Sequence, residues 1–303
     1  MDEYFPAGSM LRHVQRQRLV GLMYGFRGVL VGAAHPVAFT GTYLHTREAS
    51  TPIGRLADTG ILFEQVILGT RSEADRALRV TAAKHKRVVG TIDAAAGPYP
   101  AQTPYSAYDS ELMLWTWAVL VDSSFVFYQL LVRHLGDADR EALYRDWVRW
   151  GELFRMPAQI APPTYRDFRV WWRGEMRSPE RHLTPLAKLT AETICFRHPT
   201  PRHLVPGREL VGLLLKGTLP PPIRRMYGFV WTPAHDLAFR SAVLGLRTGR
   251  ISPRLARVGR CAPVFRFMAD YERERVERGR PTIPGLVAAA PGPSLRGEPL
   301  AEK

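Results

Sequence analysis

Residues 112–132 read LMLWTWAVLVDSSFVFYQLLV, the most apolar stretch of the chain. Its length suits a membrane span, but Asp122 and two serines lie near its middle, where a charge is costly in lipid. A second apolar stretch, LVGLMYGFRGVLVGAAHPVAF at residues 19–39, carries Arg27 and His35. Both stretches are therefore predicted to be buried core helices, and no membrane span is expected.

Helical periodicity dominates the rest of the chain, and no alternating apolar and polar runs with turn dipeptides indicate a sheet. Pro36 marks a helix boundary. Two capping-box patterns, Ser72 with Asp75 and Ser106 with Asp109, predict helix starts. The predicted helices span 9–32, 54–69, 72 to near Gly90, 109–134, 138–155, 164–178, 185–197, 206–216, 221–229, 233–247 and 262–279.

Two stretches lack helical pattern. Residues 93–108 are rich in Gly and Pro and predict a long loop, a feature often tied to function. The last residues have no apolar face to bury. A chain of 303 residues with 46% apolar content can bury a large core. The fold class is predicted to be all-α: one large multi-helix domain over residues 1–285, followed by a disordered tail over residues 286–303.

The formal net charge of +14 does not by itself identify a partner. Only five of the 42 basic residues are lysines, and the arginines alternate with acids, as in ADYERERVERGR at residues 269–280. Mixed signs on a helix predict exposed ion pairs rather than one positive stripe. No nucleic-acid-binding motif is present, so no nucleic-acid partner is expected.

Cysteine usage and the N-terminus indicate a cytoplasmic location. Cys195 and Cys261 are far apart and outside any CxxC spacing, which predicts neither a disulfide framework nor a zinc ribbon. The first residues, MDEYFPAGSMLRH, lack the charged-then-apolar order of a signal peptide.

The common phosphate, dinucleotide, serine-hydrolase and zinc-protease motifs are missing from the sequence. The glycines of GFRGVLVG at residues 25–32 are interpreted as close helix packing. Most histidines have ordinary explanations: His13, His134 and His182 are predicted to be exposed, His198 and His203 to lie in loops, and His235 to be structural in the first turn of a helix.

The segment KHKRVVG at residues 84–90 looks basic, but helical spacing separates its histidine from the charges. On a helix, one face reads Leu78, Thr81, His85, Val88 and Val89, so His85 faces an apolar stripe. Burial and nearby positive charges should both lower its pKa, and neutral imidazole is the metal-binding form. A core histidine bonded to a carbonyl explains the pattern equally, and the residues alone leave both possibilities open.

A second group of polar residues lies in GRLADTG at residues 54–60. Arg55 and Asp58 have the spacing of an ordinary helical ion pair. Arg55 and Thr59 place a guanidinium and a hydroxyl on one side, which suits a carboxylate ligand or a bound oxygen species. His35 ends an apolar helix at AAHP, where burial would demand a hydrogen-bond partner.

Five segments, taken in order, resemble the MpaB/latex-clearing-protein family of haem-dependent oxygenases: GLMYGFRGVLVGAAHPVAF, RLADT, RVTAAKHKRVVG, YSAYDSELMLWTWA and LPPPIRRMYGFVWTP, within roughly residues 8–245. The resemblance implies an all-helical protein that encloses haem b and holds its iron on one histidine, here His85. It implies Arg55, Thr59 and Tyr108 as further cofactor-binding residues. It implies Arg55, Thr59, Asp58 and His35 as candidate catalytic residues.

The implied activity is that of a haem-dependent oxygenase, or a peroxygenase-like oxidoreductase, which uses dioxygen or peroxide on an apolar or aromatic small molecule. Rubber-cleaving members carry a lysine where this chain has Asp58, and members often carry a histidine where it has Trp117. Glu48 is the nearest candidate for their distal glutamate. Rubber cleavage is therefore not carried over. The alternatives are a non-catalytic haem-binding sensor or carrier, and a basic helical protein that binds nucleic acid or an acidic membrane.

Overall fold

The computed structural model describes residues 2–45, 51–249 and 258–283 of the chain. This part is helical apart from one small two-stranded sheet, which confirms the all-α prediction. The α-helices are α1 (Met10–Gln15), α2 (Arg18–Gly32), α3 (Pro36–Leu44), α4 (Pro52–Leu68), α5 (Arg71–His85), α6 (Ser110–Leu131), α7 (Asp137–Leu153), α8 (Tyr165–Glu175), α9 (Pro185–Glu192), α10 (Val205–Thr218), α11 (Pro221–Tyr227), α12 (Pro233–Arg247) and α13 (Ala262–Glu277). The shorter elements are the 3₁₀ turns Ala158–Ile160 and Arg202–Leu204, the π-helix Thr193–Arg197, and strands β1 (Val89–Thr91) and β2 (Pro104–Ser106).

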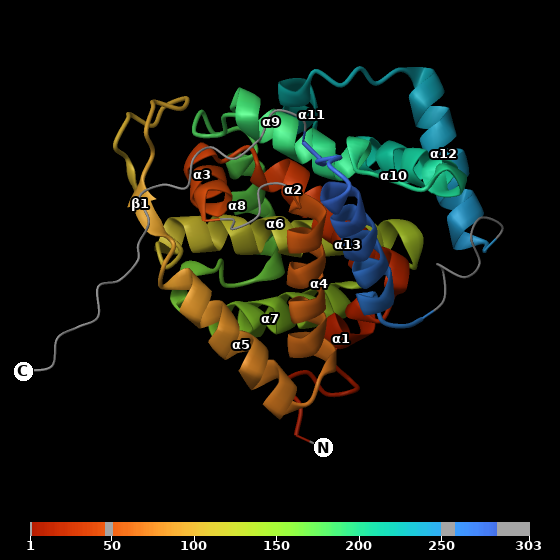
Figure 1. Ribbon diagram of the computed structural model, residues 1–303. Coiled ribbons are helices and arrows are strands. Elements are labelled where there is room, and N and C mark those ends of the chain that lie inside the picture. Colours follow the sequence, from red (N-terminus) through yellow and green to blue (C-terminus); the bar gives the residue numbers. More distant parts are fainter. Residues whose placement is uncertain (1, 46–50, 250–257, 284–303) are drawn as a thin grey trace, which may run out of the picture.

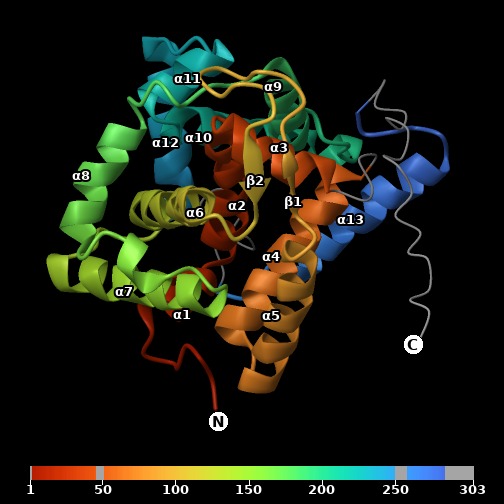
Figure 2. The same ribbon diagram turned by 90° about the vertical axis from the view of Figure 1, so that its left-hand side faces the viewer.

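The two apolar stretches of the sequence form the centre of the molecule. Helix α6 packs against α2, and α7, α3 and α12 also contact it. Figure 2 shows α6 in the middle of the surrounding helices. Gly28 of α2 faces Leu120 and Val119 of α6, since a Cβ there would lie 3.5 Å from Leu120. This glycine packs between helices, as its spacing predicted.

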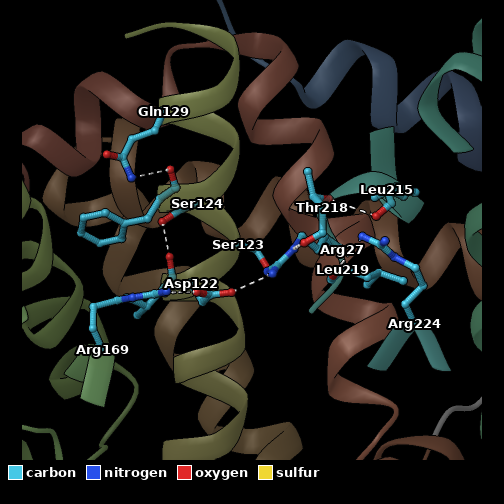
Figure 3. A network of polar contacts seen from close by, with 12 residues as sticks. Arg27, Asp122, Ser123, Ser124, Gln129, Arg169, Leu215, Thr218, Leu219 and Arg224 are labelled. Atoms are coloured by element: carbon cyan, nitrogen blue, oxygen red, sulfur yellow. Dashed lines mark hydrogen bonds and ion pairs between the residues drawn. The ribbon is translucent and has the colours of Figure 1, made fainter. Parts of the chain in front are cut away.

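The mid-helix charges Arg27 and Asp122 pair with each other inside the core (Figure 3). Their side chains are 1% and 3% exposed, and Arg27 Nη2 lies 2.8 Å from Asp122 Oδ2. Arg27 also donates to Ser123 Oγ at 2.7 Å, and Arg169 of α8 binds the other carboxylate oxygen of Asp122. The charges that argued against membrane spans therefore join α2, α6 and α8.

Among the described helices, only α6 is long and apolar enough to cross a membrane. The mean hydropathy of its most apolar window is 1.3, and 67% of that window is buried inside the protein. A helix in the centre of a protein core has the same composition and burial.

The predicted helix at residues 9–32 is two helices. Ser9 caps α1, which ends at Gln15, and α2 begins at Arg18. Gln17 between them is extended and forms a β-bridge with Val258. A backbone contact with a distant segment thus interrupts a periodic sequence. Pro36 marks a boundary as predicted, at the first turn of α3.

The two predicted capping boxes are wrong in detail. Helix α5 begins two residues earlier than expected, with Thr70 as its N-cap and Glu73 completing the box. Helix α6 is capped by Asp109 itself, whose carboxylate accepts the amides of Glu111 and Leu112 at 3.0 Å. The same sequence window held a second Thr-x-x-Glu pattern, which fits the capping box equally well.

Helix α5 ends at His85 rather than near Gly90. The chain then forms an antiparallel hairpin in which Gly90 pairs with Tyr105, so the expected loop at 93–108 contains strand β2. Glu48 and the tail 286–303 lie outside the described residues. The division at residue 285 therefore remains a prediction.

Candidate functional site

A cavity of about 200 Å³ lies where the end of α5 meets the end of α7. Its walls combine apolar side chains with one imidazole, one phenol and two guanidinium groups. The lining residues are Asp75, Leu78, Arg79, Thr81, Ala82, His85, Tyr108, Leu153, Phe154 and Arg155. Of the helix face predicted for His85, three residues line this cavity: Leu78, Thr81 and His85 itself.

His85, the last residue of α5, presents its imidazole to this cavity. The side chain is half-buried, and within the described part of the chain no hydrogen bond engages either ring nitrogen. Burial lowers the pKa of His85, which keeps the ring neutral. Neighbouring charges, which were also expected to lower that pKa, make no resolved contribution. An accessible neutral imidazole of this kind is a competent metal ligand.

Val88 and Val89 do not share the His85 face, because the helix ends before them. Val88 packs into a small cluster with Ile92 and Tyr105, and Val89 is exposed. The apolar residues Leu114 and Val121 of α6 do not line the cavity.

Tyr108 closes one side of the cavity. Its ring meets the His85 ring edge-on at 5.9 Å, and its hydroxyl donates to the Ala82 carbonyl at 3.3 Å. The Arg155 guanidinium lies 5.8 Å from the Tyr108 ring centroid. Arg155 has a φ of 71°, a left-handed conformation uncommon for a residue with a side chain. Sequence reasoning missed Arg155 and Arg79, because they look like ordinary arginines at a helix end and in a charged helix.

Arg55, Asp58 and Thr59 lie on α4 and do not line this cavity. Arg55 donates to the Thr42 carbonyl at 2.6 Å, and the Thr59 hydroxyl donates to the Arg55 carbonyl at 3.0 Å. The Arg55 side chain is accessible, yet burial lowers its pKa.

Helix α4 connects Arg55 to the cavity. Arg55, Thr59 and Phe63 recur at helical spacing and share one face. The Phe63 ring lies 6.0 Å from that of Phe154, which lines the cavity at His85. Figure 1 shows that α4 and α5 meet at one end and diverge toward the ends that carry Arg55 and His85. This face of α4 therefore reaches the cavity lining through Phe63, whereas Arg55 lies toward the diverging end of the helix.

The contacts of His35 are those of a buried residue that holds the fold. It is 1% exposed, caps α3 through Nδ1, which accepts the Ala38 amide at 3.5 Å, and its Nε2 lies 3.4 Å from the Tyr99 hydroxyl. Burial, aided by the charge of Arg181, lowers its pKa to about 3. Both ring nitrogens are engaged, so these contacts lend no support to the predicted catalytic role.

His35 should make stability depend on pH. The unfolded chain binds a proton at this residue below about pH 6.5, whereas the folded protein leaves it neutral, so unfolding takes up a proton as the pH falls. The unfolding free energy should fall by about 2 kcal/mol between pH 6.5 and 5 on this account. In His35→Asn, which keeps an N-cap acceptor, urea unfolding should show a correspondingly weaker pH dependence. Identical pH profiles for the two proteins would contradict this role.

Other candidates also have structural roles. Trp117 is buried and donates its indole N–H to the Trp147 carbonyl at 2.8 Å, so it joins α6 to α7. His235 accepts the Thr232 amide at 3.2 Å in a capping box, which confirms its structural interpretation. His198 is buried at the end of the π-helix rather than in an open loop.

Comparison with known proteins agrees with this architecture. Residues 12–248 match the family described as "ER-bound oxygenase mpaB/B'/Rubber oxygenase, catalytic domain". The uncharacterized proteins Mb2261 of Mycobacterium bovis and Rv2237 of Mycobacterium tuberculosis are each 29% identical over 214 residues, which cover 68% of this chain and 78% of theirs. No solved structure matches the chain.

The matched region contains α5, Tyr108 and the end of α7, which line the cavity. It also contains the α2–α6 core that positions them. The chain therefore belongs to the mpaB/rubber-oxygenase catalytic-domain family.

Proposed function

We propose that this protein is a haem b-dependent oxygenase that acts on an apolar or aromatic small molecule, with His85 as the axial ligand of the iron. The observation that carries the proposal is the His85 imidazole, accessible and kept neutral by burial, in a cavity with apolar and cationic walls. Membership in an oxygenase family supports the reaction class.

The donor set favours a metal that arrives with its own ligands. Within residues 2–45, 51–249 and 258–283, no three His, Cys, Asp or Glu side chains gather closely enough to hold a metal ion. A single imidazole suits haem iron, because the porphyrin would bring four nitrogen ligands of its own. This chemistry fits His85 better than a metal held only by protein side chains.

The size of the cavity places a condition on the fit. Small-molecule sites usually measure about 300–1,000 Å³, and the cavity at His85 measures about 200 Å³. A macrocycle therefore needs more room than this cavity provides. Phe154, which lines the cavity, and Phe63, whose ring lies 6.0 Å from that of Phe154, are the side chains that a bound macrocycle would displace or stack on.

The residues have distinct roles in this proposal. His85 offers a nitrogen lone pair, and Tyr108 packs edge-on against its ring. Arg79 and Arg155 line the cavity, and their charges suit the haem propionates. Leu78, Leu153 and Phe154 exclude water and provide apolar contact. A bound haem would supply the activation of dioxygen or peroxide.

The test begins with colour. Protein expressed in the cytoplasm with a haem precursor should be red and show a Soret band, and it should consume dioxygen or peroxide when screened with apolar and aromatic compounds. A colourless protein would contradict haem binding. Red protein without turnover would favour a haem sensor or carrier.

One observation favours that second function. Asp75 is the single carboxylate among the cavity's lining residues, and it accepts a hydrogen bond from the Tyr4 hydroxyl at 2.7 Å. The lining residues thus offer no carboxylate that is free of a protein partner for proton transfer.

Arg155 provides a test of propionate binding. Arg155→Gly removes the guanidinium, and glycine accepts the left-handed backbone. It should weaken haem binding about tenfold, a change of about 1.4 kcal/mol. Haem dimethyl ester, which lacks the propionate charges, should bind wild type and variant equally.

Arg145→Gln is the matched control, because Arg145 is an exposed arginine of α7, the helix that precedes Arg155, and does not line the cavity. It should leave haem affinity unchanged. Equal losses for haem and for its dimethyl ester in Arg155→Gly would show that Arg155 does not bind the propionates.

A further inference from the structure

Helices α4 and α13 cap each other with buried glutamates. Glu64 of α4 accepts the amides of Cys261 and Ala262, at the start of α13, at 2.8 and 2.9 Å. Glu272 of α13 accepts the amide of Gly54, in the first turn of α4, at 2.7 Å. The two glutamates are 2% and 1% exposed. The helices are antiparallel, and the two contacts have the same spacing along both of them.

This arrangement gives hydrogen-bond acceptors to the N-terminal amides of both helices. The first amides of a helix have no partner within it, and a carboxylate there also interacts favourably with the helix dipole. Each helix here receives its carboxylate from the other. The two helices also pack closely against each other at Gly60 of α4 and Phe265 of α13. A Cβ at Gly60 would lie only 2.4 Å from the Phe265 ring.

The contact made by Glu272 lies next to a candidate site residue. Gly54 directly precedes Arg55, whose guanidinium donates to the Thr42 carbonyl at 2.6 Å. The second carboxylate oxygen of Glu272 accepts the Thr282 hydroxyl at 2.6 Å, so the side chain is held at both oxygens. Helix α13 follows the region matched by the oxygenase family, which ends at residue 248.

We infer that Glu272 is a positioning residue: from α13, its buried carboxylate fixes the first turn of α4 and so holds Arg55, the residue after Gly54, in position. The part concerning haem rests on the proposed function. The part concerning the backbone of α4 does not. A segment outside the matched family region thus acts on the first turn of α4, which carries Arg55.

Hydrogen exchange tests the backbone directly. Glu272→Ala should raise the exchange rate of the Gly54 and Arg55 amides about tenfold, as loss of a cap of about 1.4 kcal/mol predicts. Glu272→Gln keeps an acceptor oxygen and should restore much of the protection. Glu64→Ala, at the other end of the same helix pair, should affect the start of α13 and spare Gly54. Unchanged exchange at Gly54 in Glu272→Ala would overturn the inference.

A double-mutant cycle tests the action through Arg55. Glu272→Ala should weaken haem binding several-fold in the wild type but add little in an Arg55→Gln background. Equal losses in both backgrounds would overturn positioning through Arg55. If the wild type binds no haem, the proposed function fails, and the exchange rates alone decide whether Glu272 fixes α4.

Discussion

His85→Ala is expected to yield folded, colourless protein. Removing the imidazole removes the one protein ligand proposed for the iron, so the Soret band should be lost entirely under expression conditions that turn the wild type red. The substitution is structurally mild, because His85 is the half-buried last residue of α5 and alanine has the higher helix propensity. Circular dichroism and thermal unfolding should therefore match the wild type.

A rescue experiment separates ligation from a structural effect. His85→Gly leaves room for free imidazole, so added imidazole should restore the Soret band in this variant. His134→Ala is the matched control, since His134 is exposed and does not line the cavity. If His85→Ala retained an unchanged Soret band, another residue would be the ligand. A band lost only in His35→Asn would move the ligand to His35.

The large features of the fold were predictable because they depend on local pattern. Helical periodicity predicted most helices to within a few residues, from α4 to α13. Helix α3 was not predicted. The other exceptions are places where distant residues act. Gln17 is extended because it pairs with Val258, and α5 stops at His85 because the following residues enter a hairpin with β2. Neither partner is visible from the sequence around the break.

The candidate site was predictable only in part, for a similar reason. Periodicity showed which way His85 faces, since Leu78, Thr81 and His85 do line one cavity. It could not show that Arg155 approaches from the end of α7, or that Glu272 reaches Gly54 from α13. Such contacts join residues far apart in sequence, and no local pattern encodes them.

The pairing of Arg27 with Asp122 illustrates an intermediate case. Each charge was conspicuous in its apolar stretch, and together they argued for a protein core. A buried charge must be paired, because leaving one ion without its partner in the interior is strongly unfavourable. The structure adds the identity of the partners: Asp122 receives Arg27 from α2 and Arg169 from α8, and Arg27 also donates to the Thr218 carbonyl at 3.2 Å.

Asp122→Ala is accordingly expected to be the most destabilising single substitution in the core. Among the described residues, it leaves the Arg27 guanidinium, 1% exposed, with only the Ser123 hydroxyl and the Thr218 carbonyl as partners. Removal of one member of a buried ion pair costs about 3–5 kcal/mol. This is a large share of the roughly 5–15 kcal/mol that stabilises a typical protein. Urea unfolding followed by tryptophan fluorescence should show the loss.

Two further variants give this prediction its control. Asp270→Ala breaks an exposed pair with Arg273, whose side chain is 63% exposed, and should cost less than about 1 kcal/mol. The double variant Arg27→Met, Asp122→Leu removes both charges, so it should recover part of the stability lost in Asp122→Ala. If Asp122→Ala cost no more than Asp270→Ala, the buried charge of Arg27 would have another source of compensation. The pair would then position the central helices without stabilising them.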